Sequence, residues 1–225
     1  MKKIHNITVF AILLLWSCIA LAAATVIAVN GDTQMTPLKG SPDQLAPGQR
    51  IEVGTVINTG KNSDISMRFD DGQLIALSPN TSLVINEYKF NANKPEESSF
   101  AISLLKGGMR AVTGIIGETN KDNVFFKTEV ATIVNRSADF QLFYDNQLYI
   151  TILDGAILAR NESGESIFDA KSQPIGYVVD ALTIPKSTTS DRLPVAATDN
   201  FRALQMKSLS DTSRKPNPYY IKCKE

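Results

Sequence analysis

The sequence predicts an all-β fold, from alternating hydrophobicity and from regularly spaced turn signals. Apolar and polar residues alternate over residues 65–69, and residues 140–144 and 148–153 repeat this pattern. It is typical of strands with one buried face. Turn-forming pairs such as Asp154-Gly155 separate these stretches at short, fairly even intervals. Such spacing favours a sandwich-like domain, a barrel or a β-solenoid over a parallel α/β arrangement.

The first 24 residues are predicted to be an export signal. Lys2 and Lys3 precede an apolar stretch over residues 9–20, and small residues at 20–24 offer a cleavage site. We therefore expect a bacterial, periplasmic or secreted protein whose mature chain begins at Ala23 or Thr25. Cleavage would leave no stable membrane span.

Two alternatives to cleavage stay open. Residues 8–29 carry no charge and are long enough to anchor the chain in a bilayer. Cys18 closes the outline of a lipidation signal, although Trp16 stands where a small residue is usual.

Removal of the signal leaves little catalytic chemistry. His5 is the only histidine and lies inside the signal, and Cys223 is then the only cysteine. This excludes Ser/His/Asp and Cys/His catalysis and zinc sites built from imidazoles or paired thiolates. We predict that the protein is not an enzyme and has no catalytic residue, metal site or cofactor. Cys223 is either a free tail residue or an intermolecular link.

The charge balance gives no support to a nucleic-acid partner. The chain has 23 basic and 23 acidic side chains, without a run of five or six like charges. Loss of Lys2 and Lys3 would leave a net charge of −2.

The same pattern predicts hairpins and a core. The stretches 65–69 and 74–77 flank Asp70-Asp71-Gly72, whose aspartates we interpret as turn residues, because a calcium loop needs further alternating ligands and a distal glutamate. We expect burial of Phe69, Leu77, Ile85, Leu104, Ile133, Phe140, Ile150 and Ile152.

One helix is predicted, over residues 199–209. Asp199 would cap its start, and Phe201, Leu204 and Leu209 would share one face. Ser, Thr, Pro and charged residues are frequent after about Leu182, which is typical of a linker. The predicted organisation is a signal peptide (1–24), a β domain (25–182), and a linker, short helix and flexible tail (183–225).

The order of turns and strands resembles the FecR domain. The blocks that carry the resemblance are residues 68–72 with 87–90, then 104–114, then 127–133, supported by 47–48, 53–55, 59–60, 153–155 and 176–181. Together they run from about Thr25 to Ala181. The resemblance implies a non-catalytic module of the bacterial envelope.

Two departures limit what the resemblance implies. Where the family usually reads Ala-Thr-Ile-Gly-Val-Arg-Gly-Thr, residues 131–138 keep Arg136 but place Val134 and Ser137 at the glycines, so we expect an altered turn or a relaxed requirement there. FecR regulators also carry a cytoplasmic segment that engages a sigma factor. Only residues 1–7 precede the apolar stretch here. The chain therefore resembles the sensor part of these regulators alone, and this resemblance implies no contact with a sigma factor.

Four residues are candidates for a structural turn or for recognition: Gly107, Gly108, Arg110 and Arg136. We interpret Gly107 to Arg110 as a turn, because paired glycines permit positive φ or close packing of strands. We expect Arg110 and Arg136 to donate to loop carbonyls, since arginine offers five donors in a fixed fork.

Three classes of function stay open. The first is a binding or scaffold module that recognises an envelope protein, with a role in surface signalling. The second is a binder of cell-wall glycan, such as peptidoglycan, which would depend on exposed aromatic side chains. The third is a glycan-acting enzyme that uses a pair of carboxylates in one cleft.

Overall fold

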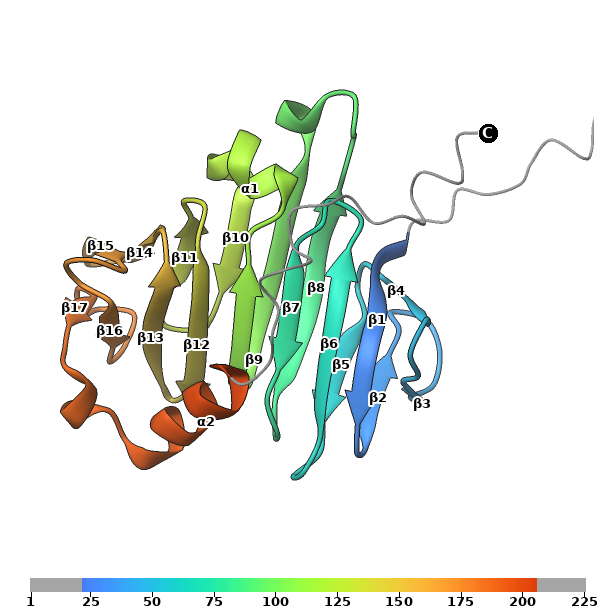
Figure 1. The fold of residues 1–225 in the computed structure, drawn as a ribbon, viewed down its shortest axis with the longest axis horizontal. Helices are drawn as coiled ribbons and strands as arrows, with labels where there is room; N and C mark the ends of the chain where they lie inside the picture. Colours follow the sequence, from blue (N-terminus) through green and yellow to red (C-terminus); the bar gives the residue numbers. More distant parts are fainter. Residues whose placement is uncertain (1–21, 206–225) are drawn as a thin grey trace, which may run out of the picture.

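The computed structural model describes residues 22–205 as two antiparallel-rich β-sheets that share one long strand (Figure 1). That strand is β9 (Ser99–Val112). The all-β prediction is confirmed. The predicted signal segment up to residue 21, with Cys18, and the tail with Leu209 and Cys223 lie outside the described residues.

Sheet A is antiparallel throughout and includes the second half of β9. Its strands in spatial order are β4 (Arg50–Glu52), β1 (Ala22–Asn30), β6 (Asp64–Phe69), β7 (Leu74–Leu77), β9, β12 (Asp139–Asp145), β13 (Gln147–Asp154), β16 (Ile175–Val178) and β17 (Lys186–Ser187).

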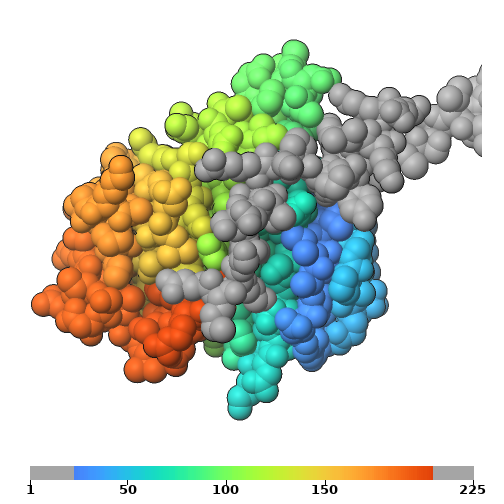
Figure 2. Space-filling model, in the orientation of Figure 1, coloured from blue at the N-terminus to red at the C-terminus, as the bar shows by residue number. Residues whose placement is uncertain are grey.

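Sheet B includes the first half of β9 and is antiparallel except where β9 pairs with β10. Its strands in spatial order are β3 (Asp43–Gln44), β2 (Thr33–Thr36), β5 (Val56–Thr59), β8 (Ser82–Lys89), β9, β10 (Val124–Lys127), β11 (Thr132–Asn135), β14 (Ala156–Asn161) and β15 (Gly164–Asp169). In Figure 2 the blue N-terminal strands and the orange segment after about residue 155 lie at opposite ends of the molecule.

The core lies between the two sheets and contains side chains from both. An aromatic series crosses it: Phe69 of sheet A meets Phe100 of sheet B at 4.9 Å between ring centroids, and Phe126 of sheet B meets Phe140 of sheet A at 4.9 Å. Both contacts are edge-to-face, the arrangement that aromatic quadrupoles favour. All eight predicted core residues are buried.

The predicted hairpins are confirmed. β6 and β7 flank residues 70–73, β12 and β13 flank Asn146, and β13 and β14 flank Gly155. Asn146 and Gly155 have φ of 64° and 74°, the left-handed conformation that Asn and Gly tolerate in tight turns.

The helical segments are short, and none within residues 22–205 has the length and hydrophobicity needed to cross a membrane. They are η2 (Pro95–Glu97), α1 (Ile115–Thr119), η3 (Lys121–Asn123), η4 (Ser190–Arg192) and α2 (Val195–Gln205). Strand β17 and helix α2 continue the packed structure beyond Leu182.

The predicted C-terminal helix exists, but its predicted start at Asp199 is wrong. The main-chain oxygen of Pro194 accepts a bond from Thr198 N–H at 3.1 Å, so Asp199 lies inside α2. Proline suits a helix start, because its fixed φ and missing N–H cost nothing there. Phe201 and Leu204 are buried, as predicted.

We expect Ile150→Ala to lower the free energy of unfolding by roughly 2–5 kcal/mol, because Ile150 is fully buried and its truncation leaves a cavity between the sheets. Ile167→Ala is the matched control, since Ile167 is 51% exposed and its truncation should cost less than about 1 kcal/mol. Urea denaturation measures both. Equal losses in the two variants would contradict the assignment of the core.

Candidate functional site

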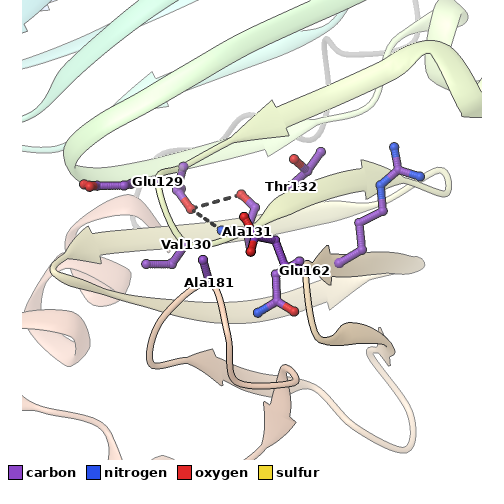
Figure 3. Close-up of a pocket in the computed structure, with 9 residues that line it drawn as sticks. Glu129, Val130, Ala131, Thr132, Glu162 and Ala181 are labelled. Carbon is purple, nitrogen blue, oxygen red and sulfur yellow. Dashed lines mark hydrogen bonds between the residues drawn. The ribbon is translucent and has the colours of Figure 1, made fainter.

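Two neighbouring clefts meet at the turn between β10 and β11, and we call them the turn clefts. The first has a volume of about 350 Å³ and is lined by residues 128–132, Arg160, Asn161, Glu162 and Ala181 (Figure 3). The second has a volume of about 360 Å³ and is lined by Ser103, Leu104, Leu105, Thr128, Glu129 and Tyr144. Because Thr128 and Glu129 line both, the clefts adjoin.

A compact set of hydrogen bonds holds the turn that separates the clefts. Thr128 N–H donates to the main-chain oxygen of Ala131 at 2.9 Å, and Thr128 Oγ1 donates to the same oxygen at 3.0 Å. Ala131 N–H in turn donates to Thr128 Oγ1 at 3.1 Å. The turn therefore presents Glu129 from a defined backbone.

The Glu129 side chain is held by Tyr144 of β12. Tyr144 Oη donates to Glu129 Oε2 at 3.1 Å. Burial, together with this bond and the nearby charge of Glu129, raises the pKa of Tyr144 above its ordinary value, so the phenol stays a donor at neutral pH. In Figure 3 the Glu129 side chain points away from Glu162.

The opposite wall of the first cleft is also fixed. Asn161 Nδ2 donates to the main-chain oxygens of Asp180 at 3.1 Å and Thr183 at 2.6 Å, which holds the segment bearing Ala181 against the β14–β15 turn. The guanidinium of Arg160 lies 5.9 Å from the Phe125 ring centroid. The walls thus combine charges of both signs with small apolar surface. The sequence analysis did not predict this cleft, because its residues come from separate segments of the chain.

Gly107 and Gly108 lie within β9 and not in a turn between strands, which corrects the predicted turn. Residues 99–106 pair with β8 in sheet B, whereas residues 107–112 pair with β12 in sheet A. Gly107 has φ of 88° at the point of transfer. A Cβ there would lie 2.6 Å from Thr81 Cα and 2.7 Å from the Asn80 oxygen, so only glycine fits.

Arg110 is 7% exposed and lies in strand β9, which corrects its predicted place in a turn. Its Nε and Nη2 donate to Asp139 Oδ1 and Oδ2 at 2.8 and 2.6 Å, a bidentate pair. Nη1 also donates to the main-chain oxygen of Leu204 at 3.3 Å. The guanidinium does bind a carbonyl, but one that belongs to helix α2.

The range of residues 55–158 matches the family described as FecR protein. The chain contains a FecR domain. The match runs from just before β5 into β14, so it includes the second turn cleft and the whole β10–β11 turn. Arg160, Ala181 and helix α2 lie beyond it.

None of the curated proteins matches the sequence. Two crystal structures of a "putative anti-sigma factor" from Parabacteroides distasonis ATCC 8503 are similar to the chain. The structure at 2.50 Å resolution has 12% identity and a TM-score of 0.37, and the alignment covers 56% of this chain and 60% of that one. The structure at 1.65 Å resolution has 11% identity and a TM-score of 0.40, with 67% and 74% covered. The chain thus spans less than two thirds of the first of these structures.

The FecR block at residues 131–138 has a left-handed residue, Ser137, at the position of the second family glycine. Ser137 has φ of 65°, a conformation that costs a non-glycine residue about 1–2 kcal/mol. The Arg136 side chain is exposed. Its main-chain N–H donates to the main-chain oxygen of Ala156 at 3.2 Å. The structure does not bring Arg136 together with Gly107, Gly108 and Arg110 into one site, since it lies at the end of β11 in sheet B.

The two aspartates of the first FecR block, Asp70 and Asp71, bind different groups within the domain. Asp70 Oδ2 lies 3.0 Å from Arg50 Nη2. Asp71 is buried and accepts from Gln73 N–H at 3.2 Å and Ile116 N–H at 3.3 Å. Within residues 22–205 no group of three or more His, Cys, Asp or Glu side chains could hold a metal ion.

We expect Gly107→Ala to destabilise the FecR domain more than Gly48→Ala. The two glycines have similar φ, 88° and 85°, so both variants carry a left-handed cost of about 1–2 kcal/mol. Nothing lies within 4 Å of a Cβ at Gly48, whereas overpacking at Gly107 should add roughly 1–3 kcal/mol. Urea denaturation of the two variants is the measurement, and equal losses would show that β9 can bend without close packing at Gly107.

We expect the protein to become more stable as pH falls from 7.5 to 5. Burial raises the pKa of Asp71 from 3.8 to about 6 in the folded state, so folding takes up a proton across this window and stability should rise by about 1 kcal/mol. Asp71→Asn should be less stable overall, because the single oxygen of its amide replaces the two carboxylate oxygens that accept the N–H bonds. Its stability should also not rise as pH falls from 7.5 to 5. Thermal melts of both proteins at pH 5 and 7.5 test this. If Asp71→Asn gains as much stability at pH 5 as the wild type does, another group causes the pH dependence.

Proposed function

We propose that this chain is an exported, non-catalytic signalling module of the bacterial envelope that binds a protein partner through the turn clefts. The FecR domain is the observation that carries the proposal. We expect the chain to act without a cofactor, without nucleic acid and without direct contact with a sigma factor.

The chemistry of the turn clefts supports a protein partner. Glu129, Glu162 and Arg160 supply charge of both signs, which gives specificity and register to an interface. Leu105, in the second cleft, is 51% exposed, and Leu182, next to Ala181 of the first cleft, is 72% exposed. Exposed leucines beside fixed polar groups suit a partner segment with apolar anchors and a polar rim.

The glycan alternative has less support from the surface. A binder of sugar rings needs exposed aromatic faces on which the rings can stack. Among the residues 22–205, the large apolar side chains that are exposed are all aliphatic: Ile27, Leu38, Leu105, Ile167, Leu182, Ile184 and Val195.

The carboxylate-enzyme alternative is weakened by the setting of the two glutamates in the first cleft. A glycosidase keeps one carboxyl protonated by placing it in an apolar pocket. Glu129 and Glu162 are both exposed, and Glu129 is bound by the Tyr144 hydroxyl.

The test is capture of envelope proteins by the purified full chain, compared with co-sedimentation on purified peptidoglycan. We expect Leu105→Glu to weaken protein capture at least tenfold with an unchanged melting temperature, because it places a charge where an apolar anchor should pack. Leu38→Glu is the matched control, since Leu38 is an exposed leucine outside the clefts. Co-sedimentation with peptidoglycan without protein capture would contradict the proposal. Equal capture by the two variants would show that the turn clefts are not the binding surface.

A further inference from the structure

Helix α2 packs on the outward face of sheet A, apart from the main core. Ala197 and Phe201 pack with Phe143, and Leu204 packs with Leu74 and Ala76. These two clusters are separate from the core between the sheets. Removal of α2 would therefore expose a strip of sheet A without opening the main core.

The face beneath α2 binds main-chain oxygens of the helix. Arg110, held by Asp139, donates to the Leu204 oxygen at 3.3 Å, and Gln141 Nε2 donates to the Phe201 oxygen at 3.0 Å. Main-chain oxygens are common to every residue, so these two bonds recognise the backbone of the helix and not a particular side chain.

Side-chain selection on this face comes from spacing. Ala197, Phe201 and Leu204 stand at i, i+4 and i+7 and are buried, which is one stripe of a helix. The opposite side of α2 is charged and exposed: Asp199 and Arg202 have side-chain exposures of 62% and 71%. The face thus fits an amphipathic helix whose apolar stripe lies against sheet A and whose backbone reaches Arg110.

The fit of α2 to this face is incomplete. Gln141 Oε1 and Thr151 Oγ1 are buried without a hydrogen-bond partner. The two residues are directly opposed on β12 and β13. Buried polar atoms are almost always paired in folded proteins. In addition, a helix of 11 residues is only marginally stable alone, so α2 depends on this face and not the reverse.

We propose that the outward face of sheet A is a docking site for an amphipathic helix, which α2 occupies in cis and which a helix of a partner protein enters by displacing α2. The proposal goes beyond the proposed function, since it names a second surface and a kind of partner. It does not involve the turn clefts, so either surface can fail without the other.

The test measures binding of a helix peptide to the full chain in trans. The probe is a fluorescent peptide of residues 193–205, cross-linked between the exposed positions 199 and 203 to hold the helix. The full chain carrying Phe201→Asp has a weakened cis helix and should bind the probe at least tenfold more tightly than the wild type, in which α2 competes at high effective concentration. Fluorescence anisotropy measures both affinities.

Two controls make the result specific. The probe carrying Phe201→Asp should not bind, and Arg110→Met added to the Phe201→Asp chain should weaken binding at least tenfold, because the probe loses its carbonyl partner. Circular dichroism shows whether each variant retains its strand content. Equal binding to wild type and variant, or no binding to a folded Phe201→Asp chain, would overturn the proposal. A doubled mass of the wild type in light scattering, abolished by Phe201→Asp, would also overturn it, since a second copy would then be the occupant.

Discussion

The passage of one strand through both sheets is the constraint on which the rest of the structure depends. The first half of β9 lies between β8 and β10, and its second half lies between β7 and β12. The change of sheet takes place at Gly107, against the backbone of Asn80 and Thr81. The hydroxyl of Thr81 accepts Gly108 N–H at 3.0 Å, so the connection from β7 to β8 and the bend in β9 support each other.

This geometry gives the two halves of β9 different tasks. The first half ends at Leu104 and Leu105 in the second turn cleft, and the second half places Arg110 on the outward face of sheet A. The two proposed contact surfaces are therefore joined by a few residues of one rigid strand. Sites built on strands hold their side chains more tightly than sites on loops.

Some residues of the FecR pattern form hydrogen bonds inside the domain. Asp71 is buried to bind two backbone N–H groups, and Tyr88 Oη accepts the N–H of Asp71 itself at 2.9 Å. Burial also raises the pKa of Tyr88 well above its ordinary value. Ser137 has a left-handed φ of 65°, so this turn has a conformation that glycine adopts more easily than serine. A block can thus mark the family while its side chains remain inaccessible to a partner.

The sequence by itself determined the fold class, the hairpins at residues 70–73, 146 and 155, and eight buried core residues, because alternation and turn chemistry are local properties. It also indicated Phe201 and Leu204 as one face of a helix. Only the tertiary structure decided that Gly107 bends a strand between sheets, that Arg110 meets Asp139 and the end of α2, and that Glu129 meets Tyr144. These contacts depend on strand register and on pairing across 15 to 94 residues of chain, and neither is encoded in the pattern of neighbouring residues.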